Sequence, residues 1–498
     1  MSEDKSTRTL DDRFAEYLFD PKDPDPNEVG TAPAGKGGEP SVEDIRFDIL
    51  PEELIRYLKS YIVGQDKAID IIATKICTHF HRMQFERDHP ELPRIVGHVK
   101  SNILLIGPTG VGKTYLIRLI ANKLRVPFVK GDATKFSETG YVGGDVEDLV
   151  RELVYQVDGN IPLAEYGIIY IDEIDKIAST GFWNGPDVSR SGVQRNLLKL
   201  MEETEVDMKV PHDLASQMEA VIETQRTGKA VRKKINTRNI LFVMSGAFLG
   251  LVDIISRRLK KGGMGFTGEA IVSPTEIEFL LDNMQSQDLV DYGFESEFVG
   301  RVPVVTDLRE LDEEGLYQIL KNPKSAVIQS KKRDFASYNI SIEFDEQALR
   351  SLAREALSYK TGARGLVSVF EKTLMPFERS LPSTGINRLS VTPELCESPE
   401  VHLAEILNRH AFESFASNFL KHTGIVILFT EDAKTAAREM ALKRNIDLTT
   451  LLKETLKNYD YGLKLIEIEE FIVTPEVLKN SQSHLDRLIK TSYRRANQ

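Results

Sequence analysis

The residues whose spacing most clearly predicts chemistry form the run Gly107-Pro108-Thr109-Gly110-Val111-Gly112-Lys113-Thr114. This run follows an apolar segment of strand length and precedes a helix-forming segment, which is the setting of a P-loop. Its glycines allow backbone amides to close around phosphates, the ammonium group of Lys113 neutralises the outer phosphates, and the hydroxyl of Thr114 can bind Mg²⁺. We therefore expect Pro108 through Thr114 to bind ATP, with Thr114 as a magnesium ligand.

A pair of carboxylates, Asp172 and Glu173, ends the apolar segment Ile168-Ile169-Tyr170-Ile171. Ligands of open α/β sheets bind at the carboxyl ends of the strands. Because successive side chains of a strand point in opposite directions, we expect different roles: Asp172 in the magnesium shell, and Glu173 as the catalytic residue that orients and polarises the attacking water. Such a pair alone is usually part of a solvated loop, but downstream of a P-loop the functional interpretation is favoured.

Strand and helix patterns alternate along the chain from Phe47 to about Asp307. Such alternation predicts an α/β fold, with a parallel sheet covered by helices on both faces. After about Asp307 helix patterns dominate, which indicates a smaller, mainly helical domain. The predicted strands are residues 101–107, 126–129, 168–172 and 239–245.

Composition and pattern divide the chain into four predicted parts. These are a flexible arm rich in proline, glycine and acidic residues (1–45), a large nucleotide-binding domain (46–308), a small helical domain (309–400) and a C-terminal α+β extension (401–498). The extension contains a possible internal repeat, because ISIEFDEQALRSLAREAL from Ile340 resembles IVILFTEDAKTAAREMAL from Ile425, and VTPEL from Val391 resembles VTPEV from Val473. The extension is thus predicted to be a degenerate copy of the small domain; the alternative is two unrelated helical segments of similar composition.

Composition also bears on partners and location. The chain of 498 residues has 64 basic and 76 acidic residues and a net charge of −12, which argues against nucleic acid as a main partner. Its apolar runs are far shorter than the roughly 20 residues that a membrane span needs, and the start MSEDKSTRTLDDRF lacks a secretory pattern. We expect no membrane association and a cytoplasmic location. The two cysteines, Cys77 and Cys396, fit a reducing compartment and cannot form a four-thiolate zinc site, so no zinc is expected.

Taken together, the motifs resemble the ClpX family of AAA+ proteins. The similarity extends from about Leu50 to Glu400 and is carried by the runs YIVGQDKA, KSNILLIGPTGVGKT, GYVGGDVED, YIDEIDKI, SGAFLGL, EFVGRVPVV and KTGARGL. Members of this family form hexameric rings that unfold tagged proteins at the expense of ATP and feed them to the peptidase ClpP. The resemblance therefore implies an ATP-dependent unfoldase and translocase, a homo-hexamer, and a ClpP-like peptidase as partner.

The resemblance also implies roles for five further residues. Ile62 and Val63 are expected near the adenine, Ser245 at the sensor-1 position, and Arg364 at the sensor-2 position. Arg301 would be the arginine finger, a catalytic residue that reaches the nucleotide of a neighbouring subunit. Charge that builds up on a transferred phosphoryl group requires such cations.

Two glycine-rich segments complete the resemblance. Tyr141-Val142-Gly143 corresponds to the pore loop that grips the substrate, and the alternative is a turn with a packed tyrosine. Met264-Gly265-Phe266 corresponds to the loop that docks on the peptidase, and the alternative is a simple flexible loop. Methionine adapts well to irregular apolar pockets, so Met264 is compatible with docking.

The chain departs from the family pattern in three places. The residues before Phe47 contain no cysteine, so we expect no zinc-binding N-terminal module of the family type. Residues 203–236 lack the Arg-Lys-His signature, so we expect the recognised tags to differ. The extension past about Glu400 has no family counterpart and lacks the arginine of GARGL. We hypothesise that it docks on the rim of the ring and modifies substrate access or partner choice. The functional alternatives are a non-proteolytic remodelling chaperone and, less favoured, a DNA-linked AAA+ motor.

Overall fold

A computed structural model describes residues 47–93, 97, 99–137, 144–178, 188–208, 233–260 and 274–496. Two compact units divide the chain. The first comprises the described residues up to Val327 together with Ala353–Val367, and the second comprises Ile328–Leu352 together with the described residues from Ser368 onward. The chain passes between the units three times, within the helices α14 (Ala326–Ala336), α15 (Glu346–Ser358) and α16 (Ala363–Ser380). The four-part division proposed from the sequence stays a prediction.

The first unit is built on a five-stranded sheet with the strand order β2-β3-β6-β1-β7. All four neighbouring pairs are parallel, which confirms the predicted α/β fold. Three of the strands carry the motifs found in the sequence, whereas β7 was not among the predicted strands. The bounds are β1 (Ile103–Ile106), β2 (Phe128–Asp132), β3 (Ile168–Asp172), β6 (Leu241–Gly246) and β7 (Val304–Asp307).

Both faces of this sheet are covered, which explains the nearly continuous apolar runs of β1 and β3. Side chains of β1 alternate between two cores: Ile103 and Leu105 lie in one, and Leu104 and Ile106 lie in the other. The first core includes side chains of α2 (Pro51–Lys59), α3 (Asp66–Asp88) and α4 (Lys113–Leu124). The second includes side chains of α5 (Glu147–Gln156), α7 (Val188–Met201), α9 (Leu251–Lys260), α11 (Ser286–Tyr292) and α12 (Ser296–Gly300).

Shorter elements connect this framework. The turns after β2 and β3 form the 3-10 helices η2 (Ala133–Lys135) and η3 (Ile174–Ile177). A small antiparallel pair, β4 (Glu205–Asp207) with β5 (Lys234–Asn236), follows α7. The remaining elements are α6 (Ile161–Ala164), η4 (Thr237–Asn239), α10 (Pro274–Asp282), α13 (Glu313–Lys321) and α14 (Ala326–Ala336), of which α14 leads into the second unit.

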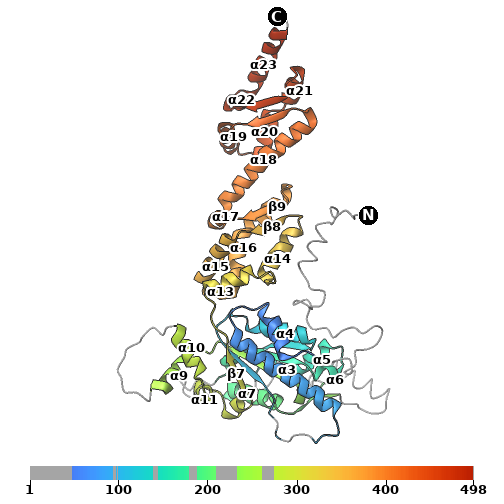
Figure 1. Cartoon of the computed structure of the whole chain (residues 1–498), viewed down its shortest axis with the longest axis vertical. Helices are drawn as coiled ribbons and strands as arrows, with labels where there is room; N and C mark the ends of the chain where they lie inside the picture. Colours follow the sequence, from blue (N-terminus) through green and yellow to red (C-terminus); the bar gives the residue numbers. More distant parts are fainter. Residues whose placement is uncertain are drawn as a thin grey trace, which may run out of the picture. The chain divides into compact units, whose positions relative to one another are not determined.

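Two similar segments follow one another along the chain from β8 onward (Figure 1). The first has β8 (Ser341–Phe344) paired in parallel with β9 (Arg388–Val391), with α15, α16 and η5 (Leu381–Ser383) between them. The second has β10 (Val426–Phe429) paired in parallel with β11 (Glu470–Val473), with α19 (Glu431–Arg444), α20 (Leu448–Thr455) and α21 (Tyr459–Leu465) between them.

A Thr-Pro pair starts a short helix after the second strand of each segment. Thr392 precedes α17 (Pro393–Glu397), and Thr474 precedes α22 (Pro475–Lys479). A longer helix follows in each case, α18 (Pro399–Thr423) and α23 (Ser481–Ala496). The two segments share this element order, and the interpretation of the extension as a degenerate copy of the small domain stays a prediction. None of the helices in the described part of the chain combines the length and the apolar character needed to cross a membrane.

Candidate functional site

The P-loop lines a pocket in the first unit with a volume of about 500 Å³. Segments far apart in the sequence form its walls: the end of the α2 region, the P-loop, the turn after β3 and the start of α16. Most of the residues predicted to bind nucleotide meet here, namely Ile62, Val63, Thr109, Gly110, Val111, Gly112, Lys113, Thr114, Asp172, Glu173 and Arg364.

Two glycines of the P-loop are required by close backbone contacts. A Cβ atom on Gly107 (φ 153°) would lie 2.3 Å from the carbonyl oxygen of Leu308, and one on Gly110 (φ 81°) would lie 2.0 Å from that of Thr361. Any other residue would therefore both clash and adopt a strained backbone. The amide of Ala363 donates a hydrogen bond of 2.9 Å to the carbonyl of Gly110. This bond joins the segment that carries Arg364 directly to the P-loop.

The ammonium group of Lys113 is folded back on the P-loop. Its Nζ donates to the carbonyl oxygens of Gly107 at 2.6 Å and Pro108 at 2.7 Å. Burial lowers the pKa of Lys113, and the nearby carboxylates of Asp172 and Asp175 oppose part of this effect. Lys113 also begins α4, whose first backbone amides and dipole favour an anion. Phosphate oxygens at this point would replace the carbonyl partners and favour the charged lysine.

The carboxylate of Asp172 lies within a network of polar side chains. Its Oδ2 atom is 3.5 Å from the Thr114 hydroxyl and 3.1 Å from Lys130 Nζ, and its Oδ1 accepts a hydrogen bond of 2.7 Å from Ser245. Burial alone would raise the pKa of Asp172, but the Ser245 hydrogen bond and the Lys130 cation hold it below its usual range. A hydroxyl and a charged carboxylate this close together are suitable oxygen ligands for Mg²⁺.

Tyr170 and Lys130 belong to this network, although the sequence analysis assigned neither to the site. The Tyr170 hydroxyl lies 2.6 Å from Ser245 Oγ and accepts a hydrogen bond of 3.1 Å from Thr114. Burial raises the pKa of Tyr170 to about 12, so its hydroxyl is neutral. Tyr170 precedes Asp172 by two residues on one strand, and the period of two places both on the same face. That spacing is a signal from which Tyr170 could have been predicted.

Asp172 and Glu173 do not both lie on the strand, although the sequence analysis expected this. The strand β3 ends at Asp172, and Glu173 has a left-handed backbone (φ 57°) at the start of η3. The two carboxylates therefore separate because the chain turns, and not because strand residues alternate. Glu173 is exposed and lines the pocket.

Three predicted residues of the described chain do not line this pocket. Pro108 contributes its carbonyl to Lys113. Ser245 is fully buried on β6 and donates its hydrogen bond to Asp172 without lining the pocket. Arg301 lies in another pocket of the first unit, where its guanidinium is 2.7 Å from the carboxylate of Glu202. The predicted pore and docking residues, Tyr141, Val142, Gly143, Met264, Gly265 and Phe266, lie outside the described residues.

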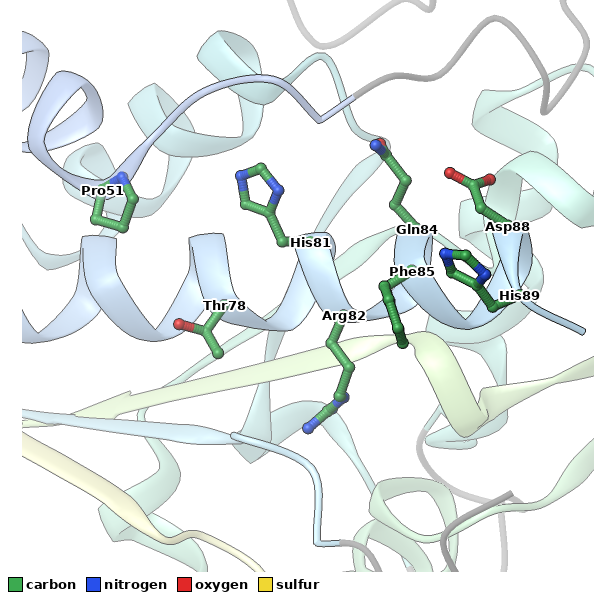
Figure 2. A pocket seen from close by; sticks show the side chains of 8 residues that line it. All are labelled: Pro51, Thr78, His81, Arg82, Gln84, Phe85, Asp88 and His89. Atoms are coloured by element: carbon green, nitrogen blue, oxygen red, sulfur yellow. The ribbon is translucent and has the colours of Figure 1, made fainter. Parts of the chain in front are cut away.

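A further pocket lies along α3, away from the predicted residues (Figure 2). Two of its polar side chains hold the preceding chain segment in place. His81 Nε2 is 2.9 Å from the carbonyl oxygen of Ile49, and Gln84 Oε1 accepts a hydrogen bond of 2.7 Å from the amide of Phe47. Both side chains therefore hold residues 47–50 against α3.

Comparison with known families agrees with this geometry. Residues 98–305 match the family described as the AAA domain (Cdc48 subfamily). Residues 311–377 match the C-terminal, D2-small domain, of ClpB protein. The first match contains the P-loop, the acidic pair and Arg301, and the second contains Arg364.

Two curated proteins that resemble the chain bear the name "ATP-dependent Clp protease ATP-binding subunit ClpX". The one from Treponema denticola is 38% identical over 336 residues, which are 67% of this chain and 77% of the relative. The one from Borrelia duttonii is 36% identical over 369 residues, which are 74% of this chain and 82% of the relative. The resemblance inferred from the motifs is thereby confirmed.

Proposed function

Since this chain belongs to the ClpX family of AAA+ proteins and is an ATPase, we propose that it unfolds and translocates proteins as a homo-hexameric ring. We further propose that it delivers them to a ClpP-like peptidase and works in the cytoplasm. The observation that supports the proposal best is the pocket in which the P-loop, the acidic pair and Arg364 converge. The hydrogen bond from the Ala363 amide to the Gly110 carbonyl joins the segment that carries Arg364 to the P-loop.

Each predicted residue that lines the pocket has a role in this proposal. Ile62 and Val63 contact the adenine, while Lys113 and Arg364 compensate charge on the phosphates. Glu173 orients and polarises the attacking water, and its exposed position leaves its carboxylate accessible to solvent.

Thr114 and Asp172 would hold Mg²⁺, which supplies positive charge to the phosphates when it is bound. Ser245 keeps Asp172 charged and oriented through its hydrogen bond. Ser245 therefore acts on the nucleotide through Asp172, because it does not line the pocket itself.

Three assignments extend beyond one subunit. Arg301 is absent from the lining of its own subunit's nucleotide pocket, which is consistent with a role in a neighbour's pocket. Tyr141-Val142-Gly143 would grip the substrate, and Met264-Gly265-Phe266 would dock on the peptidase, both by family resemblance. The proposal includes no zinc, no nucleic acid and no membrane partner.

A degradation assay on a stably folded reporter protein tests the proposal. With ATP, Mg²⁺ and the ClpP-like peptidase of the same organism, we expect the reporter to unfold and be degraded. Glu173→Gln should bind ATP and barely hydrolyse it, whereas Lys113→Ala should weaken binding itself. If the wild-type chain hydrolyses ATP but never unfolds a tagged reporter, the unfoldase proposal is wrong.

The same assay separates the alternative function, a remodelling chaperone that works without proteolysis. In that case the reporter would lose its fold and remain intact, with or without the peptidase. Phe266→Ala gives a second readout, because it should abolish degradation and leave reporter unfolding unchanged if the docking assignment is correct.

A further inference from the structure

Arg301 is held in the first unit by two contacts. It follows the last residue of α12, and its backbone carbonyl accepts a hydrogen bond of 2.9 Å from Asn102. Its guanidinium lies 2.7 Å from Glu202, with about 40% of each side chain exposed (40% and 43%). A guanidinium has five donors, so one carboxylate contact can fix its direction and still leave donors for a phosphate.

Glu202 directly follows the last residue of α7, and Gln194, within α7, is fully buried. The side-chain amide of Gln194 makes three hydrogen bonds. Its Nε2 donates to the carbonyl oxygens of Ile177 at 2.8 Å and Gly293 at 3.4 Å. Its Oε1 accepts from the amide of Glu295 at 2.9 Å. A buried amide that is satisfied in this way fixes the backbone segments it joins.

The partners of Gln194 lie at two functionally distinct places. Ile177 ends η3, the helical turn that starts directly after Glu173. Glu295 is the N-cap of α12, and Arg301 is its C-cap. Ser191, also on α7, donates a hydrogen bond to the carboxylate of Glu295. Helix α7 is thus bonded to the turn after the acidic pair, to the start of α12 and, through Glu202, to the arginine at its end.

We propose that α7 positions Arg301 and ties that position to the turn after Glu173 in the same subunit. Gln194 sets the start of α12, and Glu202 sets the direction of the guanidinium at its end. A shift of the turn after Glu173 during hydrolysis is then passed to the arginine that the subunit presents to its neighbour. The inference rests on the proposed role of Arg301 across a subunit boundary. Gln194 and Glu202 are positioning residues in this scheme.

Rings mixed from two variants isolate this effect. The supplying subunit carries Glu173→Gln, so it cannot hydrolyse ATP but still presents Arg301. The receiving subunit carries Arg301→Ala and keeps Glu173. If the mixed ring hydrolyses ATP faster than a ring of either variant alone, the additional hydrolysis takes place in receiving subunits that have Arg301 of a supplying subunit at their nucleotide. Any further change placed in the supplying subunit reports on the arginine alone.

Adding Glu202→Ala to the supplying subunit should lower kcat of the mixed ring roughly tenfold, since a small misplacement of a catalytic group is costly. KM for ATP should change less than about twofold, because substrate binding is not altered. Glu202→Gln keeps an acceptor oxygen and should restore part of the rate. The matched control is Glu203→Gln, whose carboxylate contacts Asn236 at 3.3 Å and lines the same pocket. It should leave kcat unchanged.

Gln194→Met in the supplying subunit tests the contacts in the middle of α7, because methionine has a similar length and lacks the amide. It should lower kcat of the mixed ring as well. Because Gln194 is buried, its substitution could destabilise the fold, so the melting temperature of Gln194→Met is compared with that of the unsubstituted chain. If the melting temperature is lower, the inference is judged on the Glu202 variants alone, because Glu202 is partly exposed.

The outcomes distinguish the inference from its premise. If the parent mixed ring is no more active than either variant alone, Arg301 does not act across subunits, and that part of the proposed function is wrong. If the parent ring is active and Glu202→Ala leaves kcat unchanged or raises it, Arg301 is a finger but α7 does not position it. A rate lost with Glu202→Ala and equally with Glu203→Gln would also contradict the inference, because charge alone would explain it.

Discussion

The small-domain segment from β8 to α17 and the extension segment from β10 to α22 follow the same path and differ at two places. In both, the helix that follows the first strand of a parallel pair ends in a turn with a left-handed residue, Lys360 (φ 52°) in the first and Asn445 (φ 51°) in the second. The buried positions of the strands are also alike. Ile342 pairs with Leu389, and Ile427 pairs with Phe471.

The first difference lies in that turn. In the small-domain segment, the residues after Gly362 bond to the P-loop and place Arg364 in the nucleotide pocket. In the extension, Asn445 is followed by Ile446 and Asp447, and Asp447 caps α20 through a hydrogen bond of 2.8 Å from the Thr450 amide. The same scaffold can therefore contact a nucleotide or merely begin the next helix, depending on a few residues of one turn.

The second difference lies on the outer face of the strand pairs. On β8 and β9 this face is polar, and Glu343 and Arg388 form an ion pair of 2.7 Å. On β10 and β11 the corresponding face exposes Val426, Leu428 and Ile472, with Leu428 directly opposite Ile472. The buried faces of the two strand pairs are thus both apolar, whereas their outer faces differ in polarity.

The largest expected effect concerns the arginine of the turn. Arg364→Ala should lower kcat for ATP by about 100-fold or more, because loss of a cation at the phosphates removes transition-state stabilisation. The matched variant of the extension, Arg444→Ala, lies next to Asn445 and should leave kcat within a factor of about two. Steady-state ATPase at saturating ATP measures both. Equal losses would mean that the extension also contributes to hydrolysis.

A smaller effect is expected from Gly362→Ala. A Cβ atom here would lie 2.8 Å from the carbonyl oxygen of Gly110, in a left-handed backbone. The strain of about 1–3 kcal/mol should weaken nucleotide binding by roughly tenfold or more. Asn445→Gly changes a left-handed residue in the corresponding turn of the extension and should leave nucleotide binding unchanged. Titration with a fluorescent nucleotide measures both, and an unchanged affinity of Gly362→Ala would argue against this close approach.

The outer faces should contribute little to stability. Leu428→Glu combined with Ile472→Ser makes the extension resemble the small-domain segment, and it should change the free energy of unfolding by less than about 0.5 kcal/mol because both side chains are about half exposed (46% and 52%). Ile427→Ala on the buried face is the control that must destabilise the extension. Thermal unfolding of the full chain measures both. A large loss from the double variant would show that this face is covered in the assembled protein.

The smallest expected effect is a pH dependence confined to the extension. Burial, with a contribution from Arg487, lowers the pKa of His484 below its usual value of 6.5, and its Nδ1 lies 3.4 Å from the Tyr459 hydroxyl. The unfolded chain therefore binds a proton at a higher pH than the folded chain does, so stability falls as the pH drops below about 6.5 toward the folded pKa.

Residues 341–397 contain no histidine and provide the internal comparison. Hydrogen exchange of the strand amides at pH 7.5 and 5.5 should show greater opening of β10 and β11 at the lower pH. His484→Gln should remove this difference, and His422→Gln, at an exposed position of α18, should not. Equal acid sensitivity of β8 and β9 would contradict the assignment to His484.

Local patterns were sufficient to predict much of the fold and the pocket. The P-loop, the acidic pair and the predicted strands each depend on neighbours in the sequence, and the pocket residues Ile62, Val63 and Arg364 came from family motifs. The contact of Ser245 with Asp172 and the ion pair of Lys130 with Asp172 depend on the strand order β2-β3-β6, which no local pattern specifies. The pairing of Glu202 with Arg301 is a long-range contact of the same kind.

The bond between Ala363 and Gly110 also bears on how the protein is made. A ribosome releases the P-loop long before it reaches Arg364, and domains generally begin to fold from the N-terminal end during synthesis. The nascent chain must therefore carry an incomplete nucleotide cradle while most of the remaining chain is still being translated. A pocket that includes Arg364 can therefore form only after this residue has left the ribosome, so shorter nascent chains lack one of its cations.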